Sequence, residues 1–138
     1  MTPVPPPGFQ KAVGTDPAED RIGPFFMNRT ATDCRTALFP ETHHTNLLGT
    51  VHGGVLMTFA DFTFCAVGKT GSDDASIVTV SLTTEFVRAA PTGVWLFGEG
   101  AITRRTGSLV FVQGRLCQSE GEAVMTFSGI GKRIFGDS

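Results

Sequence analysis

Residues 53 to 67, GGVLMTFADFTFCAV, constrain the fold of this 138-residue chain more than any other stretch. Their apolar side chains fall on nearly every side of a helix, and a helix that is apolar all round is enclosed by protein. Asp61 stands in the middle of it, where an ionised carboxylate is costly unless it is paired. Two interpretations are open: Asp61 lies on a narrow polar stripe beside solvent or a bonded neighbour, or it is a base or nucleophile in a dry cleft.

Gly53 and Gly54 open this helix, although glycine is a poor helix former. Either they permit a tight turn from loop to helix, or a ligand approaches the backbone closely there. The first amides of a helix are free donors at the positive end of its dipole, and such donors can polarise a carbonyl. Gly53 and Asp61 are separated by about 12 Å along one helix. If both act on one substrate, two antiparallel copies must share the sites, so the spacing predicts a homodimer.

After Gly71 the pattern changes to period two, which is typical of strands. In the first of these segments, IVTVSLTTEFV, the alternation predicts that Val78, Val80, Leu82 and Phe86 face inward. Later segments are separated by RTG and SEGE, which are short enough for hairpins between antiparallel strands. The sequence thus predicts an α+β fold with an antiparallel sheet of five to six strands around one long helix. Residues 1–28 are predicted to be an N-terminal tail with weak helical character, and residues 29–138 a single domain.

Composition excludes several classes of function. The net charge is -2 and no stretch concentrates Lys and Arg, so nucleic acid binding is not expected. The apolar run in the helix is too short to span a bilayer, and the N-terminus is Pro-rich where a signal peptide would be basic and apolar. We therefore expect a cytoplasmic protein without membrane contact. The three cysteines are interpreted as reduced core residues. His43 and His44 are interpreted as solvated loop residues, and together with His52 they lack further ligands at metal-binding spacing, so no metal is expected.

One motif points to a known family. It is N-x-x-G-x-x-H-G-G followed by Asp, formed here by Asn46, Gly49, His52, Gly53, Gly54 and Asp61. This motif resembles the signature of hotdog-fold acyl-CoA thioesterases of the phenylacetate-pathway (PaaI-like) group, and the order of elements is similar over residues 30–135. The resemblance implies a hotdog fold, with Asp61 as nucleophile or general base. It also implies that the Gly53 amide of the neighbouring subunit polarises the thioester carbonyl.

The same resemblance assigns roles to further residues. Asn46 would lie near the carbonyl, His52 would orient groups in the loop, and Thr79, with Ser81 as a nearby option, would help to place water. The implied assembly is a homodimer that pairs again into a homotetramer. The implied substrate is a small aromatic or medium-chain acyl-CoA, with no cofactor other than the coenzyme A (CoA) of the substrate.

The substrate contacts are predicted from residue chemistry. Gly54 and Phe62 are placed at the substrate, and Arg88, Arg104 and Arg105 are either solvated charges or contacts to the CoA phosphates. Two alternative functions stay open. A hotdog enoyl-CoA hydratase or dehydratase would need a catalytic histidine opposite an acid, and a non-catalytic acyl-CoA-binding protein would need an output domain or an altered site.

Overall fold

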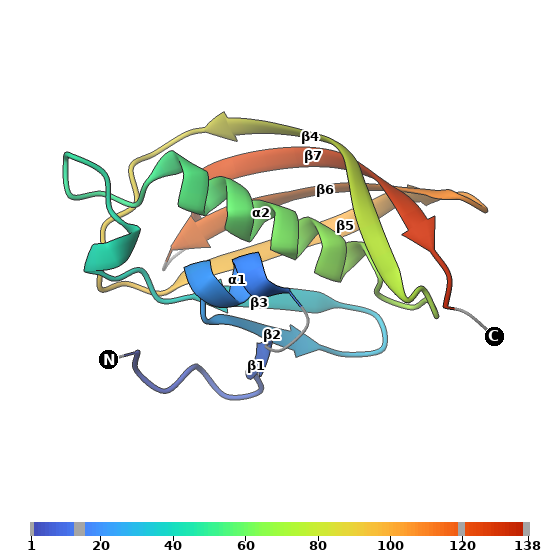
Figure 1. Cartoon of the computed structure of the whole chain (residues 1–138), viewed down its shortest axis with the longest axis horizontal. Coiled ribbons are helices and arrows are strands. Elements are labelled where there is room, and N and C mark those ends of the chain that lie inside the picture. Colours follow the sequence, from blue (N-terminus) through green and yellow to red (C-terminus); the bar gives the residue numbers. More distant parts are fainter. Residues whose placement is uncertain (1, 13–15, 119–120, 137–138) are drawn as a thin grey trace.

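The long helix α2 (Gly53–Gly68) lies across the concave face of a seven-stranded antiparallel sheet (Figure 1). The structure is a computed structural model that describes residues 2–12, 16–118 and 121–136. Phe59 and Phe64 of α2 are fully buried against the sheet, as expected for a helix that is apolar on most sides. The predicted α+β class, with a sheet wrapped around one helix, is confirmed.

The sheet contains more strands than the sequence predicts. In spatial order the strands are β1 (Gln10–Ala12), β2 (Phe25–Arg29), β3 (Cys34–Leu38), β5 (Leu96–Arg105), β6 (Leu109–Gln118), β7 (Glu122–Ile134) and β4 (Ser76–Phe86). All neighbouring strands pair antiparallel, and β4 stands at one edge. A short 3-10 helix, η1 (Thr42–His44), precedes the loop that leads to α2. No helix in the described part of the chain is long and apolar enough to cross a membrane.

The N-terminal region differs from the predicted tail. Residues 10–29 contribute β1, β2 and the short helix α1 (Pro17–Ile22), so the sheet extends beyond the expected boundary at residue 28. Helix α1 forms because Asp16 caps it, its Oδ1 accepting a hydrogen bond from Glu19 N at 3.1 Å, and because proline is favoured in the first helical turn. The buried side chain of Phe25 anchors β2 in the core. Residues 1 and 13–15 of the predicted tail lie outside the described residues.

A β-bulge in β4 corrects the predicted faces of this strand. Val80 is an extra residue between the pairs that Thr79 and Ser81 make with β7. As a result Thr79 faces α2 in the first half of the strand, and Leu82 packs against the core in the second half. Val78 and Val80, predicted to face inward, are instead 51% and 61% exposed, and Phe86, also predicted to face inward, is 55% exposed at the end of the strand. A single inserted residue reverses the parity of a strand, and regular alternation cannot reveal it.

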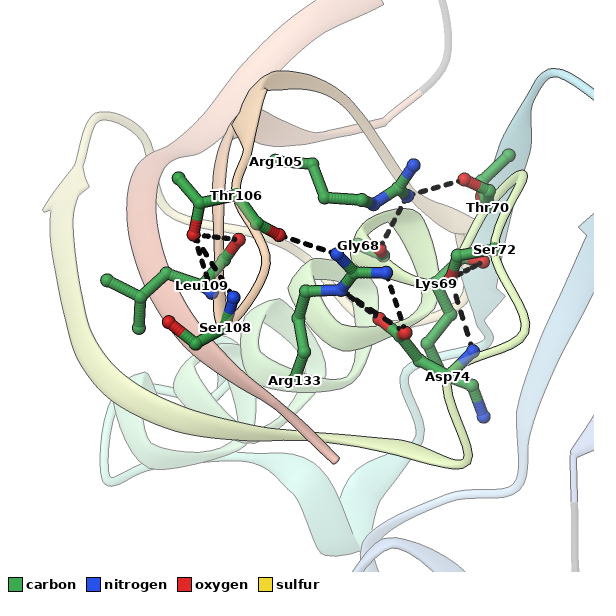
Figure 2. Close-up of polar contacts among 10 residues, drawn as sticks. All are labelled: Gly68, Lys69, Thr70, Ser72, Asp74, Arg105, Thr106, Ser108, Leu109 and Arg133. Carbon is green, nitrogen blue, oxygen red and sulfur yellow. Dashed lines mark hydrogen bonds and ion pairs between the residues drawn. The ribbon is translucent and has the colours of Figure 1, made fainter. Parts of the chain in front are cut away.

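The C-terminal end of α2 is held by two arginines (Figure 2). One amino group of Arg105 donates hydrogen bonds to the carbonyls of Gly68 at 3.0 Å and Thr70 at 2.7 Å. These carbonyls belong to the last turn and the following residues, where a cation is favoured by the helix dipole. Arg133 donates to both carboxylate oxygens of Asp74, whose side chain is completely buried. The end of the helix is therefore bonded to β5, and the loop that follows it is bonded to β7.

Candidate active site

Asp61 and Thr79 meet between α2 and β4. The Thr79 hydroxyl donates a hydrogen bond of 2.5 Å to Asp61 Oδ1, which stabilises negative charge on the carboxylate. Both residues line a pocket of about 570 Å³. Its apolar lining includes Phe62, which directly follows Asp61, and Met27 of β2. Asp61 thus combines a charged oxygen, a hydroxyl partner and open space for a small molecule.

Cys65 lies one helical turn after Asp61 in the same pocket. Burial raises the pKa of its thiol to about 12, and the negative charge of Asp61 acts in the same direction. Its sulfur lies 3.6 Å from the carbonyl oxygen of Ile77 and 3.8 Å from the Thr79 hydroxyl. The thiol therefore stays protonated and is not a nucleophile. Cys34, Cys65 and Cys117 are all free.

The N-terminal end of α2 leaves one amide unpaired. His52 caps the helix, and its Nδ1 accepts a hydrogen bond from Gly54 N at 2.8 Å. Within the described residues Gly53 N has no hydrogen-bond partner. A Cβ atom at Gly53 would lie 3.3 Å from the ring of Phe86, which is tighter than ordinary contact. Glycine therefore keeps this free donor open to an approaching group.

The Gly53 amide opens into a second pocket, of about 300 Å³, which Asn46 and Arg88 also line. Asn46 mainly shapes the preceding loop: its Oδ1 accepts from Leu48 N at 2.9 Å, and its Nδ2 donates to Thr50 Oγ1 at 3.0 Å. The side-chain NH2 group of Asn46 has two N–H donors, so its second N–H can still donate to a ligand. The structure thus brings Asn46, Gly53 and Arg88 together at one end of the helix.

The two pockets do not share lining residues. Asp61, Phe62 and Thr79 line one, and Asn46 and Gly53 line the other. A single chain therefore separates the carboxylate from the free amide, as expected from about 12 Å of helix between them.

A family model described as the thioesterase superfamily matches residues 48–125, which is more than half of the chain. The chain belongs to the thioesterase superfamily. A relative, the "Putative esterase PA0474" of Pseudomonas aeruginosa, is 32% identical over 127 residues, covering 91% of this chain and 94% of its own. The family match identifies the chain as a thioester hydrolase, and the name of the relative as an esterase agrees with this.

Solved structures with the same architecture include PaaI proteins. A variant of the phenylacetic acid degradation protein PaaI from Thermus thermophilus has a TM-score of 0.75 at 22% identity, covering 86% of this chain and 100% of that one. The E. coli PaaI protein has a TM-score of 0.76 at 18% identity, with coverages of 88% and 87%. BH2602 from Bacillus halodurans, solved with CoA, has a TM-score of 0.71 at 21% identity, with coverages of 80% and 74%. The hotdog fold of this thioesterase is confirmed.

The three arginines that the sequence suggests for phosphate contacts do not lie together in this thioesterase. Arg88 is exposed near the Gly53 pocket and forms an ion pair of 2.9 Å with Glu122. Its backbone bonds to Val124, at the end of the sheet where β5 begins, whereas Arg104 and Arg105 stand where β5 ends. The hydrogen bonds of Arg105 to the carbonyls of Gly68 and Thr70 engage part of its guanidinium group.

Sequence reasoning missed several charged residues of the Asp61 pocket in this thioesterase. These are Asp16 and Glu19 around α1, Arg29 of β2, and Lys69 after α2. A signal for α1 was present, because the sequence DPAE places a capping residue before a first-turn proline and puts Glu19 at the third helical position. Nothing in the sequence indicates that this helix packs against α2, since that contact joins distant segments.

His44 was interpreted with His43 as a solvated loop residue, and the structure corrects this. The His44 side chain is buried, its Nδ1 accepts from Glu41 N, and its Nε2 bonds to the carbonyl of Ile22 at 2.5 Å. His44 thus connects the loop that precedes α2 to the end of α1.

Proposed function

We propose that this thioesterase hydrolyses acyl-CoA, with Asp61 as nucleophile or general base and the Gly53 amide of a neighbouring subunit polarising the carbonyl. The proposal rests on one observation: the two candidate catalytic groups of a single chain lie in different pockets. A carboxylate bonded to Thr79 lies in one pocket, and an unpaired helix amide lies in another. A second copy that supplies the missing half would complete each site.

The residues present are sufficient for thioester chemistry. In the general-base route, water oxygen bonds to the carbonyl carbon while Asp61 takes the water proton. The carbon–sulfur bond then breaks, its electron pair leaves with sulfur, and Asp61 returns the proton to the thiolate. In the nucleophilic route, the Asp61 carboxylate bonds to the carbonyl carbon, and the carbon–sulfur bond breaks with its electron pair leaving on the thiolate. Water then hydrolyses the resulting anhydride to the free acid and Asp61, and the proton released in this step goes to the thiolate. In both routes the Gly53 N–H stabilises the negative charge that develops on the carbonyl oxygen.

The edge strand β4 supports the proposed dimer. It stands at the end of the sheet, and the side chains of Val78, Val80 and Phe86 are more than half exposed. Pairing with a second β4 would satisfy the open backbone groups and cover these apolar side chains. A further pairing of dimers into a tetramer is part of the same proposal.

The pocket properties support a small acyl group and a CoA contact at Arg88. The Asp61 pocket, of about 570 Å³, has an apolar lining that includes Phe62, Met27 and Ile77, which suits a small aromatic or medium-chain acyl group. Arg88 lies beside the Gly53 amide, so it is well placed for a phosphate of CoA bound there. The BH2602 structure, which contains CoA, supports this substrate class. We propose no cofactor apart from the CoA of the substrate.

The test is release of free thiol from a panel of aromatic and aliphatic acyl-CoAs, with Asp61→Asn as the matched inactive variant. We expect the wild-type protein to release thiol from at least one small aromatic or medium-chain substrate and the variant to lose this activity. Parallel samples with an enoyl-CoA would detect hydration. Hydration without thiol release would replace the proposed function by a hydratase, and binding without either reaction would indicate a non-catalytic acyl-CoA-binding protein.

A further inference from the structure

The short helix α1 contributes a second carboxyl group to the Asp61 pocket. Helix α1 packs against α2, and Figure 1 shows it beside the middle of that helix. Glu19 lines the same pocket as Asp61 and is half-buried. No hydrogen bond to its carboxyl group is found within the described residues, so the group has no fixed partner there. Glu19 and Asp61 are far apart in the sequence, and they line one pocket because α1 packs against α2.

The position of Glu19 depends on how His44, just before the loop that leads to α2, binds helix α1. Because His44 Nδ1 accepts from Glu41 N, its Nε2 carries the proton and donates to Ile22 O, at the end of α1. The carbonyl of the same histidine accepts from His52 N, and His52 caps α2. The side chain and the backbone carbonyl of His44 thus connect α1 to the start of α2.

The charges around Glu19 are mostly negative. Burial raises the pKa of Glu19 to about 7. The neighbouring carboxylates act in the same direction; they are Asp16 and Asp20 at α1, and Asp61 of α2. The other titratable groups that line the pocket are Cys65 and Lys69 of α2 and Arg29 of β2.

The two cations do not neutralise Glu19. Arg29 donates to the carbonyl of Ala66, and Lys69 Nζ donates to the carbonyl of Ala75 at 3.2 Å. Neither forms an ion pair with Glu19 within the described residues. Glu19 therefore gains its charge close to neutral pH, next to a carboxylate that Thr79 already stabilises.

We propose that Glu19 is a positioning residue of this active site, whose ionisation places a second negative charge in the pocket of Asp61 and accelerates hydrolysis. The inference rests on the function proposed above. In both routes negative charge leaves Asp61, because its carboxylate either takes the water proton or bonds to the carbonyl carbon. A negative Glu19 thus repels the initial carboxylate more than the transition state, and it also repels the carboxylate product.

The experiment compares pH–rate profiles of the wild-type enzyme and Glu19→Gln, over about pH 5 to about pH 9. We expect the wild-type kcat to rise by about threefold to tenfold through an ionisation near neutrality, with little change in KM. Glu19→Gln should lack this rise, and Glu19→Asp should restore it. Asp20→Asn is the matched control, because it removes the same charge from the same helix at an exposed residue that does not line the pocket. A rise that persists in Glu19→Gln, or that Asp20→Asn also abolishes, would overturn the inference.

A second measurement needs no activity. Since the folded pKa of Glu19 is raised above 4.5, its value when unshifted, the native state binds the extra proton between about pH 4.5 and about pH 7. The free energy of unfolding should therefore fall as the pH rises through this window, and Glu19→Gln or Glu19→Ala should lack that component. If the free energy of unfolding shows this pH dependence but the pH–rate profiles of the wild type and Glu19→Gln coincide, the inference fails and the proposed function stands. If the wild-type protein releases no thiol from any acyl-CoA, both fail, whatever the stability shows.

Discussion

The hydroxyl of Thr79 donates a 2.5 Å hydrogen bond to Asp61 Oδ1 and thereby ties the edge strand β4 to the middle of helix α2. The donor comes from the strand that is exposed at the end of the sheet, and the acceptor from the element that the sheet encloses. Any change in the position of β4 therefore acts directly on the carboxylate. This relationship makes Thr79 a residue that can be tested separately from Asp61.

Replacing Thr79 by valine should lower kcat about tenfold, because an isosteric side chain removes the charged hydrogen bond and leaves Asp61 less well oriented. Thr79→Ser keeps a donor at the same position and should retain most of the activity. Steady-state kinetics on the best acyl-CoA substrate, with melting temperatures as the folding control, make the comparison. Equal activity of the two variants would mean that the hydroxyl has no role in turnover.

Asp61→Asn should decrease turnover at least about a hundredfold, because the amide is neither a nucleophile nor a base. Its Oδ1 can still accept the Thr79 hydrogen bond, so we expect the melting temperature to stay the same or rise slightly. Thiol release and thermal unfolding, measured on the same preparation, check both parts. A variant that keeps near-normal turnover would remove Asp61 from the chemistry.

Mixing Asp61→Asn with Gly53→Val tests the sharing of sites between subunits. The valine side chain would press on the Phe86 ring and fill the space beside the free amide, so this parent should be inactive as well. If each site takes Asp61 from one subunit and Gly53 from the other, each heterodimer regains one intact site. Subunit exchange is first verified by native mass spectrometry. Heterodimers without activity would show that the two residues do not cooperate across the interface.

Reversing the charge of Arg88 should raise the KM for acyl-CoA several-fold, with a larger effect at low salt. Arg104→Glu is the informative partner variant, since Arg104 lies at the opposite end of β5 from the Gly53 pocket. The ratio of the two KM values at two ionic strengths decides which end of the sheet receives the phosphates. Equal, unchanged KM values for both variants would reject phosphate contacts at either arginine.

Asp74→Asn should reduce the free energy of unfolding by about 3 kcal/mol at neutral pH, because it breaks the buried pair with Arg133. The hydrogen bonds from Arg133 hold the pKa of Asp74 below its usual range. The pair therefore contributes stability above the ordinary titration range of an aspartate and loses it as the pH falls below. Denaturant unfolding at several pH values should show the difference from wild type shrinking in acid. Asp73→Asn, at the exposed neighbouring position, is the matched control and should change little.

The helix, and the separation of its carboxylate from its first amide, could be predicted because both are encoded locally. Asp61 and the two glycines lie within one segment, so helical geometry alone separates carboxylate and amide. The faces of β4 could not be predicted, since the bulge at Val80 has no mark in the alternation of residue types. Glu19 was missed for another reason: its place beside Asp61 results from the packing of α1, held through His44, and not from any motif around the helix.

The bulge in β4 has a consequence for which strands can join the sheet. An open sheet edge is a template for unwanted pairing and aggregation. In β4 the extra residue Val80 breaks the regular pairing pattern, and a bulge bends and twists its strand, so a straight foreign strand matches this edge less well. A second copy of the chain brings the same interruption in its own β4. The residue that turns Thr79 towards Asp61 therefore also makes this edge a poor template for the wrong partner.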